Sequence, residues 1–377
     1  MKYESSFPSE ADGLEISVMA VIPDKKPYRA VVQLVHGMSE HKERYLPFMQ
    51  YLAKRGYVTV IHDHRGHGKS VKYQEDLGFT YGGGAEAMLK DIGTVNRKIH
   101  GTYPDLPVIL MGHSMGSLAV RAFVAQHDSC VDMLIVCGSP SYNTAMPLGV
   151  AIAKMEKAVF GPRHRSKLIE TMSFGASVAK FRKDKTCTAW ICSDPEVAKE
   201  YKESELCGFT FTDDAYLALF ELMKRAYDVE HYSCMNPKMP VLFVSGAEDP
   251  CLINVRHFAK TVQAMRHAGY LDVKGKLYSR NNVNFVPCNA KGTNKYRNKK
   301  ALAYLINFFI TPDIKKFITH YDINFDEDLF ALSALLQWIW RSQIRDGKPI
   351  QIYIPSERMR GLLKGWIGES VNLEMVA

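Results

Sequence analysis

The residues best suited to covalent chemistry lie at positions 112–116, where the letters read GHSMG. This string fits G-x-S-x-G, a pattern that places a serine on a sharp turn between a strand and a helix. The apolar run Val108–Met111 precedes it and a helical pattern follows it. Gly112 and Gly116 would remove side chains that collide at such a turn. We therefore predict that Ser114 is a nucleophile for acyl transfer, placed at a helix N-terminus whose dipole favours negative charge.

Acyl transfer also requires hydrogen-bond donors for the oxyanion that develops in the transition state. One donor should be the backbone N–H of Met115, the residue after the nucleophile. The other usually comes from the loop after an earlier strand, and here Met38 follows the apolar run Ala30–Val35. We interpret His36, in the same loop, as a packed and hydrogen-bonded histidine.

An acid is expected at the end of a later strand. The string SGAEDP at positions 245–250 follows the apolar run Val241–Ser245 and offers Asp249, with Glu248 as its neighbour. A plain turn at the end of a strand would have a similar composition. In a chain that also carries the serine turn, we predict that Asp249 is the catalytic acid.

The elements that must position these residues alternate along the chain. Buried strands are predicted from near-continuous apolar runs at Ile16–Ile22, Ala30–Val35, Tyr57–His62, Val108–Met111, Met133–Cys137 and Val241–Ser245. Helical patterns separate them at Tyr45–Arg55, Ala85–Ile99 and Ser117–His127. This alternation predicts an α/β fold with a mostly parallel sheet and right-handed crossovers.

Between residues 145 and 233 the alternation stops and helical patterns dominate. We predict that this insertion is a helical cap over the strand ends. It opens with an apolar patch, Met146–Ala153, which suits a fatty-acyl chain better than a peptide. Packing of that patch inside the cap is the alternative interpretation.

The composition is that of an ordinary globular protein. The 377 residues include 46% hydrophobic and 23% charged residues, with 48 Lys+Arg against 40 Asp+Glu. This excludes disordered, collagenous and coiled-coil proteins. The first residues contain no apolar h-region, and the apolar stretches 301–310 and 329–340 are shorter than the ~20 residues that span a bilayer. The eight cysteines show no CxxC pair and no metal-ligand spacing, so we expect free thiols in the cytoplasm.

Four strings together resemble the monoacylglycerol lipase and lysophospholipase branch of the α/β-hydrolase family. They are VHGMSEHKERY (35–45), HDHRGHGKS (62–70), LMGHSMGS (110–117) and FVSGAEDP (243–250). Two cap strings, 160–175 and 205–216, look like bacterial members. The resemblance covers roughly residues 1–278. It implies a Ser–Asp–His triad and a cap that admits single-chain acyl esters, and it implies no metal and no organic cofactor.

The sequence departs from this family where its catalytic histidine should stand. The family places that histidine after the last strand, in a string like LY-x-G-x-R-H-E, which corresponds here to about Val283. No histidine occurs between His267 and His320. His257 and His267 lie in a helical pattern and are interpreted as surface or packing residues. His41, His64 and His113 are expected nearer the site, but none matches the family's position.

Residues 284–309 and 332–366 resemble the C-terminal part of helicase- or primase-like proteins of bacterial mobile elements. They contain no P-loop and no acidic catalytic box. Basic residues gather around Tyr296, namely Lys291, Lys295, Arg297, Lys299 and Lys300. We interpret them as a solvated helix start rather than a phosphate contact, and expect no specific nucleic-acid binding. The apolar face of 329–340 should pack either on the hydrolase sheet or within its own segment.

The sequence therefore predicts an α/β-hydrolase core at 1–144 and 234–278, a helical cap at 145–233, and an appended α-rich segment at 279–377. The predicted activity is hydrolysis of small lipid-like carboxylic esters, impaired by the missing histidine, with transient contact of the cap with a membrane surface left open. Two alternatives stay open. One is a non-catalytic remnant that binds acyl ligands, and the other is a nucleic-acid-associated protein acting through its tail.

Overall fold

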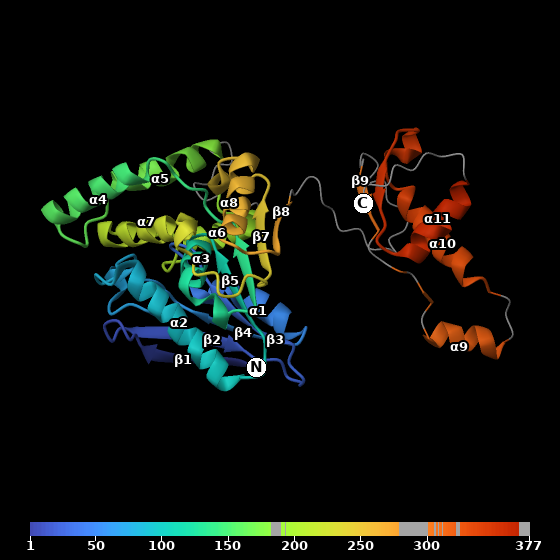
Figure 1. The fold of residues 1–377 in the computed structure, drawn as a ribbon, viewed down its shortest axis with the longest axis horizontal. Coiled ribbons are helices and arrows are strands. Elements are labelled where there is room, and N and C mark those ends of the chain that lie inside the picture. The colour runs from blue at the N-terminus through green and yellow to red at the C-terminus, as the bar shows by residue number, and fades with distance from the viewer. Residues whose placement is uncertain are drawn as a thin grey trace. The chain divides into compact units, whose positions relative to one another are not determined.

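The computed structural model describes residues 1–181, 190–192, 194–278, 301–304, 307, 309–310, 312–321 and 325–368. The chain folds into two compact units, Met1–Ser279 and Arg280–Ala377 (Figure 1). Each unit has a hydrophobic core of its own.

The first unit is built on an eight-stranded sheet. Its strands are β1 (Lys2–Pro8), β2 (Glu15–Val21), β3 (Ala30–Val35), β4 (Tyr57–His62), β5 (Val108–His113), β6 (Met133–Cys137), β7 (Val241–Gly246) and β8 (Val273–Tyr278). Their order across the sheet is β1-β2-β4-β3-β5-β6-β7-β8. Only the β1–β2 and β2–β4 pairs are antiparallel, and the other five pairs are parallel. The predicted mostly parallel α/β architecture is confirmed.

Helices cover both faces of this sheet. They are α1 (Leu46–Ala53), α2 (Gly84–Thr102), α3 (Met115–His127) and α8 (Val255–His267). The central strand β3 shows why its sequence is apolar at every position except Gln33, whose buried amide donates to the Ile92 carbonyl. Val32 and Leu34 pack with Met49 of α1, whereas Val35 belongs to the core formed with α2 and α3. A strand buried on both faces cannot alternate between apolar and polar residues.

The segment between β6 and β7 forms the cap. Its helices are α4 (Met146–Phe160), α5 (Lys167–Lys180), α6 (Pro195–Glu203) and α7 (Asp213–Tyr227). Helix α7 packs on α4 within the cap and on α3 of the core, so it joins the two layers (Figure 1). Its N-terminus is capped by Thr212, whose hydroxyl accepts a hydrogen bond from the Ala215 N–H.

Strand β1 was not predicted from the sequence. Of its residues only Phe7 is buried, and the strand pairs with β2 alone at the edge of the sheet. An edge strand with one buried side chain carries too little apolar signal to stand out from a polar loop. Its pairing from Lys2↔Val21 to Pro8↔Glu15 defines it instead.

The second unit contains α9 (Pro312–His320), α10 (Glu327–Ile339), α11 (Glu357–Ile367) and a parallel pair of short strands, β9 (Ala301–Ala303) and β10 (Gln351–Tyr353). The apolar side of α10 packs within this unit: Leu335 and Trp338 lie in one core with Tyr304 and Met359. This decides between the two packing alternatives for residues 329–340. The basic residues around Tyr296 lie outside the described residues.

Six cysteines in the described part of the chain are free thiols. None of the described helices combines the length and the apolar character needed to cross a membrane.

Candidate active site

Ser114 sits at a strained turn between β5 and α3. Its backbone has φ 52° and ψ −118°, a conformation that is rare for a residue with a side chain. Its N–H donates to the Cys137 carbonyl over 2.9 Å, which ties the turn to the end of β6. A Cβ on Gly116 would lie 2.2 Å from the Val35 carbonyl oxygen, and a Cβ on Gly112 would lie 2.3 Å from the Gly116 carbonyl oxygen. The turn can therefore form only with glycine at both positions.

Two backbone N–H groups are available next to Ser114. Met115 is the first residue of α3, so its N–H has no carbonyl one turn earlier to bond. The loop after β3 runs against the serine: a Cβ on Gly37 would lie 3.2 Å from the Ser114 Cβ. Met38 follows Gly37, and no described residue accepts a hydrogen bond from its N–H. The geometry thus places two potential oxyanion donors beside the serine.

Asp249 follows β7 and caps the short helix η5 (Pro250–Leu252). Its Oδ1 accepts from the Cys251 N–H over 2.9 Å, and its Oδ2 accepts from the Ser245 hydroxyl over 2.7 Å. These two donors fix the carboxylate at the same edge of the sheet as Ser114. Glu248 is exposed.

The last strand ends beside this acid. Strand β8 pairs with β7 as far as Tyr278, whose carbonyl accepts from the Ala247 N–H over 2.7 Å. The chain therefore leaves the sheet next to the Asp249 loop, where the family's histidine would follow. The position at about Val283 lies outside the described residues.

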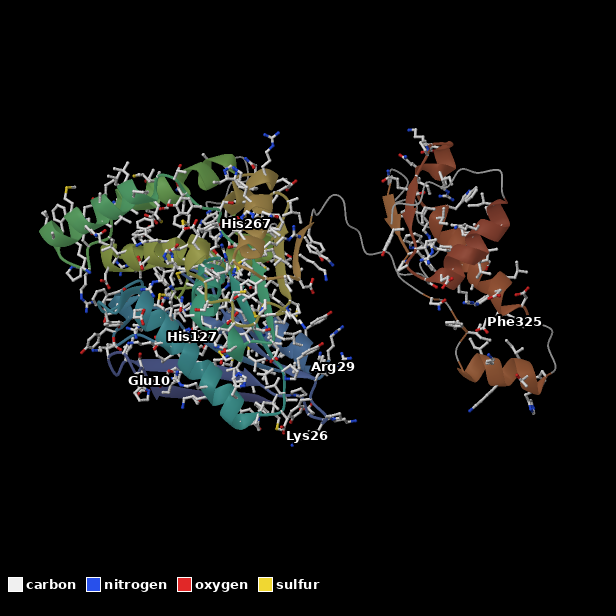
Figure 2. All side chains as sticks on the ribbon, viewed as in Figure 1. Glu10, Lys26, Arg29, His127, His267 and Phe325 are labelled. Carbon is white, nitrogen blue, oxygen red and sulfur yellow. The ribbon has the colours of Figure 1, made fainter. Side chains whose placement is uncertain are left out.

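Several other histidines have roles or positions of their own away from Ser114. His36 is fully buried, and its Nε2 accepts from the His64 N–H over 3.0 Å, in agreement with its predicted packing role. Burial, reinforced by the neighbouring His64, lowers the pKa of His36 well below its usual value. His41 pairs with Glu43, with 2.8 Å between its Nδ1 and the carboxylate. His257 bonds Asn254, and His267 is exposed on α8 (Figure 2).

One imidazole does lie close to Ser114. His113 precedes Ser114, and its Nδ1 is 3.3 Å from the Glu40 carboxylate. On its other side, the His113 Nε2 and the Asp249 Oδ2 lie 3.4 and 3.6 Å from the point that a Gly138 Cβ would occupy. Burial acts to lower the pKa of His113, but the hydrogen bond and charge of Glu40, with the charge of Asp249, raise it overall.

Glu40 is the site residue that sequence reasoning missed. Its buried carboxylate accepts from the Gly37 N–H over 2.6 Å, from the Tyr45 hydroxyl over 2.9 Å and from Arg44 over 3.0 Å. Burial opposes its ionisation, yet the hydrogen bond and charge of His113, aided by Arg44, lower the pKa of Glu40 to about 2. The signal was present in the string SEHKERY, where Glu40, Arg44 and Tyr45 lie within six consecutive residues.

Residues 26–281 match a protein family described as "Serine aminopeptidase, S33". The chain belongs to this family. Esterases and lipases stand among the proteins that it resembles. Its similarity to monoacylglycerol lipases includes the enzyme of Mycolicibacterium smegmatis, 32% identical over 53% of this chain and 63% of that protein. The monoglyceride lipase homolog of Monkeypox virus is 28% identical over 47% of this chain and 56% of the viral protein.

Solved structures agree on the fold. A thermostable carboxyl esterase from Bacillus coagulans superimposes with a TM-score of 0.68 at 25% identity, over 74% of this chain and 90% of the esterase. A lipase in its open form gives a TM-score of 0.66 at 23% identity, over 74% of this chain and 91% of the lipase.

The end of the chain matches a second family. Residues 254–367 match the YonV C-terminal Rossmann-like domain. The SPbeta prophage-derived uncharacterized protein YonV of Bacillus subtilis is 47% identical over 25% of this chain and 22% of its own length. The chain thus spans between 22% and 63% of these three curated relatives. A tail distinct from the hydrolase, related to a mobile-element protein, agrees with the sequence prediction.

Proposed function

We propose that the hydrolase unit cleaves carboxylic esters of single-chain acyl lipids, as in monoacylglycerols, and that it does so slowly. The observation that carries this proposal is the turn at Ser114, with the Gly37–Met38 loop packed against it. A serine at positive φ between a parallel strand and a helix is the arrangement that acyl transfer requires. The lipases among the relatives indicate the substrate class.

In the proposed reaction the Ser114 Oγ attacks the ester carbonyl, and the new oxyanion is held by the N–H groups of Met38 and Met115. Collapse of this intermediate expels the alcohol and leaves an acyl serine, which water then hydrolyses to the free acid and the serine. Both steps need a base that takes a proton from the attacking oxygen. Asp249 stands ready to orient an imidazole, but the sequence supplies none between His267 and His320. This is why we expect low turnover.

The cap supports a lipid substrate. Large apolar side chains are exposed along α4 and α5, at Leu148, Met155, Val159, Phe160 and Leu168. Such a surface suits acyl chains and transient contact with a lipid surface better than contact with a peptide. Trp338 of the tail is packed into a core, whereas Trp340 and Trp366 are exposed. We propose that the tail binds no specific nucleic-acid sequence, because the net positive charge of residues 279–377 is modest.

The second candidate function is acyl-ligand binding without turnover. It is favoured by the same missing histidine, since removing one member of a triad leaves only the residual catalysis of binding and the oxyanion hole, ~10³–10⁴-fold over the uncatalysed rate. Under this alternative, Ser114 would be a relic in a functional acyl pocket.

The deciding experiment combines fluorophosphonate labelling of the full chain with turnover of medium-chain p-nitrophenyl esters. We expect slow labelling and weak hydrolysis, both lost in Ser114→Ala, and no cleavage of the matching anilides. Fatty-acid binding with no labelling and no hydrolysis would favour the second function. Equal rates on esters and anilides would contradict the lipid-ester proposal.

A further inference from the structure

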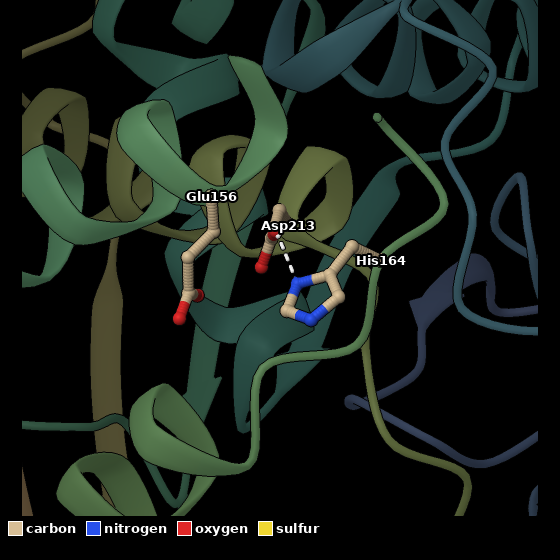
Figure 3. A group of neighbouring side chains, drawn as sticks. All are labelled: Glu156, His164 and Asp213. Atoms are coloured by element: carbon tan, nitrogen blue, oxygen red, sulfur yellow. Dashed lines mark hydrogen bonds and ion pairs between the residues drawn. The ribbon is translucent and has the colours of Figure 1, made fainter. Parts of the chain in front are cut away.

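A cluster of ligating side chains lies in the cap and takes no part in the proposed reaction. Glu156 comes from α4, His164 from the connection between α4 and α5, and Asp213 from the first position of α7 (Figure 3). One ligand atom from each residue lies within 4.8 Å of the others. Three segments distant in sequence thus bring one imidazole and two carboxylates together.

Two hydrogen bonds hold part of this cluster in place. The His164 Nδ1 is 2.9 Å from the Asp213 Oδ2, and the Asp213 N–H donates to the His164 carbonyl over 2.8 Å. The connection between α4 and α5 is therefore fastened to the N-terminus of α7. A ligand set fixed in this way loses little conformational freedom when it binds an ion.

The cluster also contains unpaired buried acid. The Asp213 side chain is fully buried, and its Oδ1 has no hydrogen-bond partner among the described residues. The Glu156 Oε2 is in the same condition. The adjacent Lys157 directs its ammonium to Asp214, at 2.6 Å, so its charge is already engaged. Buried carboxylate oxygens without partners are costly unless a proton or a cation joins them.

We propose that Glu156, His164 and Asp213 bind a divalent transition-metal ion of the zinc class. One imidazole nitrogen and two carboxylate oxygens are three ligands that Zn²⁺ accepts, with water completing the shell. Ca²⁺ and Mg²⁺ favour all-oxygen shells and should bind less well. The ion would fasten α4 to the start of α7 and stiffen the cap. Sequence reasoning predicted no metal because these positions follow no recognised ligand spacing.

The test is calorimetric titration of the metal-free full chain with ZnCl₂, together with thermal unfolding. We expect one site that Glu156→Gln and His164→Gln each weaken at least about tenfold, as loss of one of three ligands should. His231→Gln is the matched control: His231 also pairs with an aspartate, at 2.6 Å from Asp228, but on the surface and outside this cluster. This control should bind zinc like the parent chain.

Cobalt provides an independent readout, since Co²⁺ bound in the cluster should show visible absorption that Glu156→Gln removes. If the two cluster variants bind zinc and cobalt as the parent chain does, the proposal is wrong. The proposal is also wrong if Glu156→Gln raises the unfolding temperature while zinc leaves the unfolding temperature of the parent chain unchanged. A proton shared by the two carboxylates would then explain the cluster. Neither readout depends on ester hydrolysis.

Discussion

The carboxyl ends of β3 and β5 and the carboxyl ends of β7 and β8 hold different shares of the proposed site. At the ends of β3 and β5, glycines at 37, 112 and 116 allow close contacts, and the proposed nucleophile Ser114 lies at its strained turn beside the Gly37–Met38 loop. At the ends of β7 and β8 the proposed acid Asp249 is fixed by two donors. The residues from Arg280 onward belong to the second unit and match the YonV C-terminal domain. In the proposed site, the ends of β3 and β5 supply the nucleophile and its donors, whereas the ends of β7 and β8 supply the acid but not the histidine.

The difference indicates that the sheet can form without a complete catalytic site. Strand β8 pairs with β7 over its whole length even though the hydrolase sequence ends there. Residues 254–281 match both families, so α8 and β8 satisfy the requirements of either. A strand needs apolar residues and a neighbour with free ladder groups, and many sequences meet that demand. A catalytic histidine must stand at one position in a loop, and the sequence has no histidine between His267 and His320.

The largest expected effect comes from supplying a histidine in the segment after β8. Replacing residues 279–377 with a family-like segment, LY-x-G-x-R-H-E followed by a closing helix, should raise ester turnover at least ~10³-fold. The gain arises because an imidazole can then take the serine proton while Asp249 orients it. Turnover of p-nitrophenyl esters measures it, and Ser114→Ala in the grafted chain should abolish it.

Full lipase activity in the unmodified chain would contradict the inference that the missing histidine limits turnover. An existing imidazole would then serve as the base, and His113 is the one that the structure places beside Ser114. Val283→His alone is a weaker version of the graft, since the loop must also aim the ring between Asp249 and Ser114.

A second prediction tests the packing of the turn at Ser114. Gly116→Val should lower the free energy of unfolding by about 3 kcal/mol, because the added atoms would meet the Val35 backbone, which lies 2.2 Å from a Cβ. Chemical denaturation measures the loss. Gly101→Ala is the matched control, since a Cβ there meets nothing within 4 Å. Equal stability of the Gly116 variant would mean that the turn at Ser114 is not as tightly packed as described.

The third prediction concerns the Glu40 carboxylate under Ser114. Its pKa is lowered from 4.5 to about 2, so it stabilises the fold above pH 4.5, and this contribution is lost as the pH falls through 2. The difference corresponds to about 3 kcal/mol. Unfolding measured between pH 5 and pH 2 should therefore be flatter with pH in Glu40→Gln than in the parent.

Glu4 provides the comparison for this effect, because its pKa is also lowered to about 2, but by exposed lysines. Glu4→Gln should change the pH dependence less than Glu40→Gln, and its effect should shrink at high salt. The reverse order would show that the His113–Glu40 pair is not a strong buried interaction.

The sequence predicted most of the first unit because its signals are local. Apolar runs marked the buried strands β2 to β7, and the letters GHSMG marked the turn at Ser114. It missed β1, whose pairing depends on β2 rather than on its own pattern. It also missed Glu40 beside His113, and Glu156 beside His164 and Asp213, because these contacts join residues far apart in sequence. Such convergence is decided by packing, which no local spacing encodes.

The smallest effect is expected for Asp249→Asn in the unmodified chain. A catalytic aspartate acts by orienting an imidazole and stabilising its charged form, and it does nothing to the ester directly. Without a histidine between His267 and His320, the substitution should change residual turnover by less than about threefold. The amide oxygen can still accept from the Cys251 N–H, while the amide NH2 can donate to the Ser245 hydroxyl oxygen. In the grafted chain the same substitution should cost about 10⁴-fold. A large loss in the unmodified chain would instead mean that Asp249 already serves an imidazole. His113 is the first partner to test, because its Nε2 and the Asp249 Oδ2 flank the same point beside Gly138. The test combines Asp249→Asn with His113→Gln and asks whether the two losses fail to add.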